Sequence, residues 1–292
     1  MILKDILEKT THFFKGKDFE SPRLDAELLI ADVLNFSRIE LYTNHLYPLD
    51  SDQVQKCRDH VVRRGKGEPV AYILGYKDFY RSRFFVTPNV LIPRPETEIL
   101  VESAVEWIKK TGKGSDIIIA DFGAGSGCVG LSLAKEIPNA KVYLFDISSS
   151  ALDLARKNSV QLNIEDRINF VQGDINQIDK SELGFEFDLI VANPPYIDKG
   201  SFDFDPLVKE YEPNEALFSD EKGLFDEKNW AAKAFDWLTP DGAYFTEIGF
   251  DQGDFLKEHF EQELQFQKVK ILKDYSNFDR LIVASKSSSL DA

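Results

Sequence analysis

The chain has 292 residues, 43% of them hydrophobic and 29% charged, a length comfortable for two domains and a composition ordinary for a soluble globular protein. Its formal charge of −15 argues against a dedicated binder of duplex DNA, because an acidic surface repels phosphates. The only two cysteines, Cys57 and Cys128, have no C-x-x-C or histidine-rich spacing, which argues against a disulfide framework and a metal site. We also expect no signal peptide, no membrane association and a cytoplasmic location, since no stretch approaches the ~18 apolar residues of a membrane span.

Apolar residues recur at three- and four-residue spacing through the first quarter of the chain, which predicts a small helical bundle over residues 1–75. One helix is expected to start at Ser21 and Pro22, with the serine hydroxyl as cap. Its apolar face is expected to consist of Leu24, Leu28, Ala31 and Leu34. No group of residues typical of catalysis occurs in this part.

Aromatic and β-branched residues then predict a β-hairpin linker over residues 76–93. Prolines end this pattern, and Thr97 with nearby glutamates is expected to start the next helix.

Residues 94–286 alternate short apolar runs with helical stretches, which predicts an α/β domain with a mostly parallel sheet covered on both faces. The last two strands follow each other closely, so one of them should be antiparallel. Residues 287–292 are expected to form a frayed tail. The expected strands are 117–120, 142–145, 168–171, 189–192, 243–246, 269–272 and 281–284.

A glycine-rich segment follows the first strand of this domain and opens a helix. Such a loop lets the backbone approach an adenosine-containing cofactor, and Asp146, about 20 residues further on at the end of the next strand, can accept the ribose hydroxyls. The segment also reads as G-x-G-x-x-G from Gly125, so a nicotinamide cofactor, or a tight turn without a ligand, remains open. The candidate cofactor-binding residues of the loop are Gly123, Ala124, Gly125, Ser126 and Gly127.

A second candidate site, Asn193-Pro194-Pro195-Tyr196, follows the fourth strand. The Asn193 side-chain oxygen and the Pro194 carbonyl can each accept an N–H from a planar amide or amine, whose delocalised lone pair makes it a poor nucleophile. Tyr196 can stack on the planar group. This chemistry favours methyl transfer from S-adenosyl-L-methionine over hydride transfer, with Asn193 at both the substrate and the cofactor; the alternative is an ordinary surface turn.

A weaker site follows the third strand. Asp174 is a candidate acceptor for the adenine amine and Ile175 a candidate for packing on the ring, although this can be an ordinary turn.

Together these segments and several others resemble the HemK/PrmC-type peptide-chain-release-factor glutamine N5-methyltransferases. The resemblance implies a seven-stranded, Rossmann-like methyltransferase sheet that uses S-adenosyl-L-methionine and no metal. The helical domain would help to recognise the release factor, the glutamine of its Gly-Gly-Gln loop would be methylated on N5, and translation termination would be modulated. One departure is Asn277, where a glycine is common, in a turn outside the site. The further resembling stretches are 21–29, 67–75, 90–98, 211–213 with 216–217, 247–249 with 252–253, and Asp274 with 279–280.

Three alternatives compete with this interpretation. A DNA adenine-N6 methyltransferase uses the same acceptor chemistry on a flipped base, but the net charge and the compact length argue against it. A nicotinamide oxidoreductase has no use for the Asn193 site, and a catalytically silent scaffold has no need of intact Asn193 and Tyr196. We therefore expect release factors as the protein partner, no direct contact with nucleic acid, and a monomer.

Overall fold

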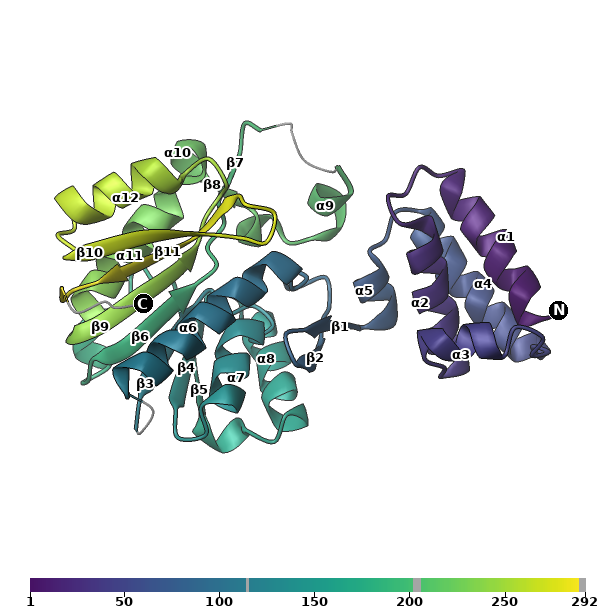
Figure 1. The fold of residues 1–292 in the computed structure, drawn as a ribbon, viewed down its shortest axis with the longest axis horizontal. Helices are drawn as coiled ribbons and strands as arrows, with labels where there is room; N and C mark the ends of the chain where they lie inside the picture. The colour runs from purple at the N-terminus through teal and green to yellow at the C-terminus, as the bar shows by residue number, and fades with distance from the viewer. Residues whose placement is uncertain (114–115, 202–205, 289–292) are drawn as a thin grey trace. The chain divides into compact units, whose positions relative to one another are not determined.

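The computed structural model describes residues 1–113, 116–201 and 206–288, and the chain divides into two compact units, Met1–Tyr76 and Lys77–Ala292. The first unit is helical (Figure 1). Its buried residues form two apolar clusters, one around Leu3 and Ile30 and the other around Phe14 and Leu29. Its helices are α1 (Leu3–Lys15), α2 (Pro22–Leu34), α3 (Arg38–Thr43), α4 (Ser51–Gly65) and α5 (Val70–Leu74).

Helix α2 buries only part of the apolar face that was expected. Ala31 and Leu34 are buried as predicted. Leu24 is exposed and Leu28 is only half-buried, whereas Asp25 and Glu27 are buried. The two acids tolerate burial because each has a cationic partner: Arg64 lies 2.8 Å from Asp25, and Arg38 lies 2.6 Å from Glu27. The apolar period therefore identifies part of the buried face of this helix but does not reveal its two buried acids.

The start of α2 also differs in one detail. Pro22 occupies the first turn as expected, but the Ser21 hydroxyl makes no capping hydrogen bond, since ψ of 58° at Ser21 departs from the extended backbone that a cap requires.

The second unit begins with the hairpin strands β1 (Tyr76–Phe79) and β2 (Ser82–Phe85). Phe79 and Phe84 pack into the core of this unit together with α6 (Glu98–Thr111). Thr97 precedes α6, but its side chain does not cap the helix.

The centre of the second unit is a seven-stranded, mostly parallel sheet, as expected from the sequence pattern and the resemblance. Its strand order is β10-β11-β9-β6-β3-β4-β5. The strands are parallel except for β11, which is antiparallel to both β9 and β10. Their bounds are β3 (Ile118–Phe122), β4 (Lys141–Asp146), β5 (Ile168–Gln172), β6 (Phe187–Ala192), β9 (Leu238–Glu247), β10 (Lys268–Lys273) and β11 (Asp279–Ser285). Of the tail expected after residue 286, residues 289–292 lie outside the described residues.

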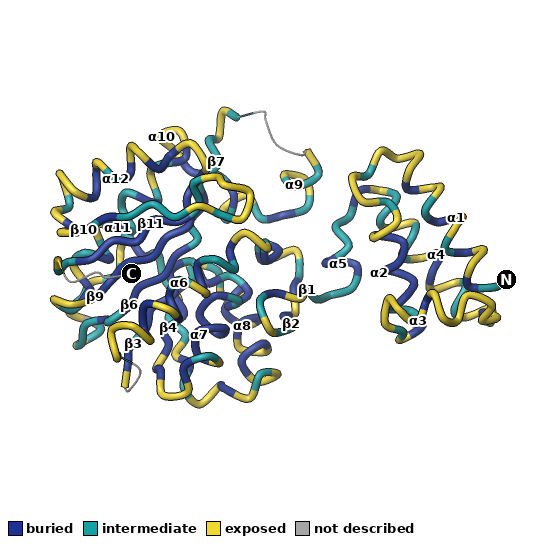
Figure 2. Tube along the Cα trace, viewed as in Figure 1, coloured by how far each residue is buried: buried dark blue, intermediate teal, exposed yellow. Residues whose placement is uncertain are grey.

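Helices cover both faces of this sheet (Figures 1 and 2). Ile119, Val191 and Phe245 point into the core on one face, which α6, α7 (Cys128–Glu136) and α8 (Ser149–Gln161) cover. Alternate residues such as Ala120 and Tyr244 point to the other face, under α11 (Phe225–Trp237) and α12 (Gly253–Gln262).

The apolar core between the sheet and helices α11 and α12 contains one buried acid. Glu227 of α11 is 1% exposed and accepts a hydrogen bond from the Thr246 hydroxyl at 2.6 Å. Burial raises its pKa well above the ordinary value, although this hydrogen bond and one from Tyr244 oppose the effect.

Short elements connect the main ones: β7 (Ile197–Asp198), β8 (Phe218–Ser219), α9 (Pro206–Tyr211), α10 (Asp220–Gly223), and the 3-10 turns at 95–97, 165–167, 180–182 and 214–216. Within the described residues, no helix combines the length and apolar character that a membrane crossing needs. In the same part of the chain, no three His, Cys, Asp or Glu side chains gather in a way that could hold a metal ion.

Candidate active site

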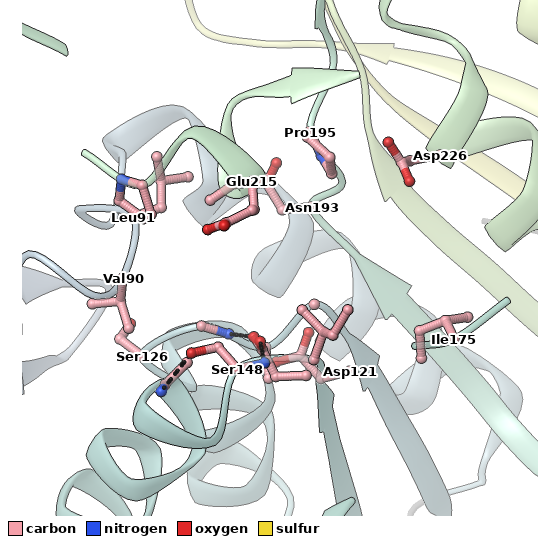
Figure 3. A pocket seen from close by; sticks show the side chains of 18 of the residues that line it. Val90, Leu91, Asp121, Ser126, Ser148, Ile175, Asn193, Pro195, Glu215 and Asp226 are labelled. Atoms are coloured by element: carbon pink, nitrogen blue, oxygen red, sulfur yellow. Dashed lines mark hydrogen bonds between the residues drawn. The ribbon is translucent and has the colours of Figure 1, made fainter. Parts of the chain in front are cut away.

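A cavity of about 400 Å³ lies where β3, β4, β5 and β6 end. Figure 3 shows Val90 and Leu91 beside this space, across from Asp121, with Asn193 and Pro195 on a further side. The candidate residues from the sequence that line it are Gly123, Ala124, Gly125, Ser126, Asp146, Asp174, Ile175, Asn193 and Pro195. The candidates Gly127, Pro194 and Tyr196 are not among the lining residues.

The glycine loop between β3 and α7 has a backbone that side chains rarely allow. Gly123, Gly125 and Gly127 have φ values of 67°, 55° and 78°. A Cβ on Gly127 would lie 2.9 Å from Leu131 Cδ1, so this glycine serves packing of the loop on its helix. A Cβ on Gly125 would meet nothing nearer than a carbonyl oxygen at 4.0 Å, in a residue that lines the cavity. The loop therefore leaves room for a ligand at Gly125.

Asp146 joins this loop to the end of β4. Its Oδ2 accepts the backbone N–H of Gly125 at 2.7 Å, and its Oδ1 accepts the N–H of Ser148 at 2.8 Å. Each carboxylate oxygen has a further lone pair, so Asp146 can hold the loop and still accept hydroxyl groups of a ligand.

The cavity contains a second acid, Asp121, at the end of β3. Burial raises the pKa of Asp121 to about 7, and the nearby charge of Asp146 adds to this, while the N–H of Gly130, 2.8 Å from Oδ2, lowers it. Burial also raises the pKa of Asp146, against the two backbone N–H groups that it accepts. Asp174, Glu215 and Asp226 also line the cavity, and this excess of carboxyl groups favours a ligand that brings positive charge or hydroxyl donors.

Two buried polar atoms of the lining residues have no partner. Ser126 Oγ and Asn176 Oδ1 make no hydrogen bond with the described residues. Since buried polar atoms are nearly always paired, their position indicates that a polar ligand completes the site.

The turn after β5 forms another wall. Ile175 is 3% exposed and offers an apolar surface. The Asp174 carboxylate accepts from the Asn176 N–H at 2.9 Å and the Gln177 side chain at 3.0 Å, which fixes its direction.

Asn193 stands at the end of β6, and its amide has one partner on the protein. Nδ2 donates to the Thr97 hydroxyl oxygen at 3.2 Å, across 96 residues of sequence. The side-chain oxygen has no such bond in the described residues and is therefore available to accept from a ligand.

Tyr196 is fixed in place by hydrogen bonds to two residues that follow β6 much later in the chain, Glu247 and Gln252. Its hydroxyl donates to Glu247 Oε1 at 3.1 Å, and its carbonyl accepts from Gln252 Nε2 at 3.1 Å. Burial and the negative charge of Glu247 raise the Tyr196 pKa, so the phenol stays protonated at neutral pH. Gly223 packs against the Tyr196 carbonyl oxygen, and a Cβ on this glycine would lie only 2.1 Å from that oxygen.

Several residues at the cavity had no role in the sequence-based prediction. Phe225, Asp226 and Trp230 of α11 line it. Arg94 and Glu212 form a 2.5 Å ion pair in which Glu212 also accepts the N–H of Ile92 at 3.0 Å, and this pair ties the segment before α6 to the segment after α9. The stretches around Arg94 and Glu212 carried the family resemblance, but residue spacing alone gave no sign of their pairing.

The sheet order with β11 reversed, the glycine loop after β3 and the acid at the end of β4 define the class: an S-adenosylmethionine-dependent methyltransferase with a Rossmann-like sheet. The particular family follows from comparison with known proteins. Residues 5–75 match the family model described as PrmC N-terminal domain, and residues 97–208 match the one described as Methyltransferase small domain. The chain belongs to the release factor glutamine methyltransferase family, as its curated relatives show.

Three relatives, each named release factor glutamine methyltransferase, illustrate the similarity. The one from Rhodopirellula baltica is 37% identical over 97% of this chain and 95% of its own length. The one from Koribacter versatilis is 36% identical over 99% of this chain and 100% of its own length. The one from Leptospira interrogans is 40% identical over 83% of this chain and 84% of its own length. Among solved structures, the hMettl16 catalytic domain, in complex with a 3′UTR hairpin, is 15% identical with a TM-score of 0.54 over 82% of this chain and 83% of that one; this likeness concerns the fold alone.

The glycine loop yields a first prediction. Gly125→Ala should cut affinity for S-adenosylmethionine at least tenfold, because the new Cβ enters the cavity, while the positive φ costs about 1 kcal/mol of folding stability. Gly112→Ala is the matched control: φ there is 69°, a Cβ meets nothing within 4 Å, and the residue ends α6 outside the cavity lining. Calorimetric titration and thermal unfolding of both variants separate the effects. Equal affinity in the two variants would refute the placement of the ligand.

Proposed function

We propose that this chain transfers a methyl group from S-adenosyl-L-methionine to the side-chain nitrogen (N5) of the glutamine in the Gly-Gly-Gln motif of peptide chain release factors. The observation that carries the proposal is the Asn193 amide: its Nδ2 is engaged by Thr97 at 3.2 Å, which leaves its oxygen free, in a cavity that Gly125 and Asp146 also line. The names of the relatives support the choice of substrate.

The residues present fit the methyl donor. Asp146 would accept both ribose hydroxyls, and the partnerless Ser126 Oγ and Asn176 Oδ1 would gain partners. Asp174 would accept from the adenine amine, and Ile175 would pack on the ring. When bound, S-adenosyl-L-methionine supplies an electrophilic methyl group on a sulfonium.

The protein's task at the acceptor is to position a weak nucleophile. The Asn193 oxygen and the Pro194 carbonyl would each accept one N–H of the glutamine amide, which fixes the nitrogen for in-line attack. Pro195 lines the cavity beside them, and Tyr196, anchored by Glu247, would cover the planar amide and exclude water.

Further proposals about partner, oligomeric state and location follow from this substrate. All lining residues of the cavity belong to the second unit, which leaves the helical unit, residues 1–75, to help recognise the release factor. A single chain supplies these residues, so we propose a monomer that needs neither metal nor direct contact with nucleic acid. Methylation there would modulate translation termination, which places the enzyme in the cytoplasm.

The test is a methyl-transfer assay with the full chain, radiolabelled S-adenosyl-L-methionine and a purified release factor. Label should enter the factor and be absent from a version whose Gly-Gly-Gln glutamine is replaced by alanine; mass spectrometry would locate the methyl group. A short Gly-Gly-Gln peptide should show a higher KM than the whole factor if the helical unit contributes to binding. Label in adenine-containing DNA, with none in the factor, would instead establish the rival activity.

A further inference from the structure

Phe250, Tyr275 and Phe278 are aromatic residues of the second unit that lie open to solvent. Phe250 is 63% exposed, Tyr275 86% and Phe278 53%. The rings of Phe250 and Phe278 pack edge to face with their centroids 6.0 Å apart, although the two residues belong to different loops. Exposed apolar surface that gathers in this way is typical of a site that another molecule covers. We call these three residues the aromatic patch.

The aromatic patch lies at the edge of the sheet where the methyl-acceptor residues lie. Phe250 follows the end of β9, and β9 is parallel to β6 and paired with it to the last residue before Asn193. Strand β11 is antiparallel to β9, so the turn before β11, which carries Tyr275 and Phe278, reaches the same edge (Figure 1). A protein that brings a side chain to Asn193 therefore meets the surface of this edge.

Hydrogen bonds join the loop of Phe250 to the acceptor motif. Gln252 Nε2 donates to the Tyr196 carbonyl oxygen at 3.1 Å, and Gln252 Oε1 accepts the backbone N–H of Gly249 at 2.9 Å. Phe250 lies between Gly249 and Gln252 in the chain. The loop that presents Phe250 therefore borders the acceptor motif directly.

The turn that carries Tyr275 and Phe278 is held in one conformation. Asp274 Oδ1 accepts the backbone N–H of Phe278 at 3.0 Å, and Asp274 Oδ2 lies 3.2 Å from Arg280 Nε. The Tyr275 hydroxyl donates to Glu102 Oε2 of α6 at 2.7 Å. Side chains that are fixed before binding lose little conformational entropy on association, so this turn is suited to hold a partner.

We propose that the aromatic patch binds the polypeptide that flanks the acceptor glutamine of the release factor, through apolar side chains of that polypeptide. This inference rests on the proposed function, because only a protein substrate presents such flanking residues. Aromatic side chains contribute strongly to protein interfaces, since each ring buries a large area at a small entropic cost. A single amide offers few atoms to hold, so contacts beside the cavity supply affinity and position the glutamine.

Phe250→Ala and Phe278→Ala test the proposal with the full chain and a purified release factor. Each should raise KM for the factor by about tenfold, because truncated aromatic contacts at interfaces typically cost this much or more. The value of kcat should stay within about twofold, since the patch lies outside the cavity lining. Both kcat/KM for a short Gly-Gly-Gln peptide and affinity for S-adenosylhomocysteine should keep their wild-type values. The double variant should lose less than the product of the two single losses, since the rings pack on each other.

Val160→Ala is the matched control. Val160 is 53% exposed, as Phe278 is, but it lies near the end of α8 that leads to the start of β5, at the opposite edge of the sheet. Its loss should leave KM for the factor unchanged. The proposal is overturned by an unchanged KM in both phenylalanine variants, or by equal losses on the factor and on the peptide.

A second copy of the chain is the other molecule that could cover the patch. Light scattering would then show a wild-type dimer that Phe250→Ala converts to a monomer without a change in KM, and this result would also overturn the proposal. Failure of the proposed function is a different outcome, in which the wild-type chain itself does not methylate the release factor.

Discussion

Asn193→Ala should lower the rate of methyl transfer by about 10²-fold or more. The substitution removes the Asn193 side-chain oxygen, which accepts no hydrogen bond from the described residues while its Nδ2 donates to Thr97. A preorganised polar contact of this kind in a closed site typically contributes a factor of about 10² to 10³. Single-turnover kinetics at saturating cofactor and release factor measure the effect directly.

Asn193→Asp is the sharper variant. It keeps an acceptor but places negative charge beside the sulfonium, whose positive charge disappears in the transition state. Cofactor affinity should therefore hold or rise while turnover falls. The aspartate also lacks the N–H that Asn193 gives to Thr97.

Asn169→Ala is the matched control for both variants. This asparagine lies exposed on β5, so its loss should leave turnover unchanged. A near-normal rate for Asn193→Ala in a folded protein would mean that the acceptor lies elsewhere.

Asp146→Ala should weaken binding of S-adenosylmethionine by roughly 2–3 kcal/mol, or about 30- to 150-fold. Two losses combine: the acceptor for the ribose hydroxyls, and the bonds of 2.7 and 2.8 Å that hold Gly125 and Ser148. Asp146→Asn keeps one acceptor oxygen and should lose less. Isothermal calorimetry with S-adenosylmethionine and S-adenosylhomocysteine gives the affinities.

Asp153→Ala provides the comparison, because Asp153 is exposed on α8 and outside the cavity lining. If the Asp146 variant is folded and binds both ligands as the wild type does, the ribose assignment fails.

The strands and helices of the second unit were predictable because each is a local pattern. A buried parallel strand needs a largely apolar run, and β3 and β6 have one; glycines at positive φ explain the loop at Gly123 and Gly125. The antiparallel strand near the C-terminus followed from the short link between the last two runs, and β11 confirms it.

The pairs that support the site were not predictable in this way. Thr97 with Asn193 spans 96 residues and Arg94 with Glu212 spans 118, and no local pattern relates such distant positions. Thr97 shows the difficulty: a threonine before a helix suggests a cap, yet its hydroxyl serves the end of β6. Tertiary contacts outweigh local preference at such positions.

The buried acids alter how the molecule carries charge. The formal net charge of −15 counts every carboxyl group as ionised. Burial, however, raises the pKa of Glu227 well above its ordinary value and the pKa of Asp121 to about 7. At neutral pH the native protein therefore holds protons that an unfolded chain, with ordinary carboxyl groups, gives up. Unfolding is then a proton-releasing event, so alkali favours it and mild acid opposes it between the ordinary and the raised pKa values. The contribution of these two buried acids to folding stability is therefore larger on the mildly acidic side of neutrality than on the alkaline side.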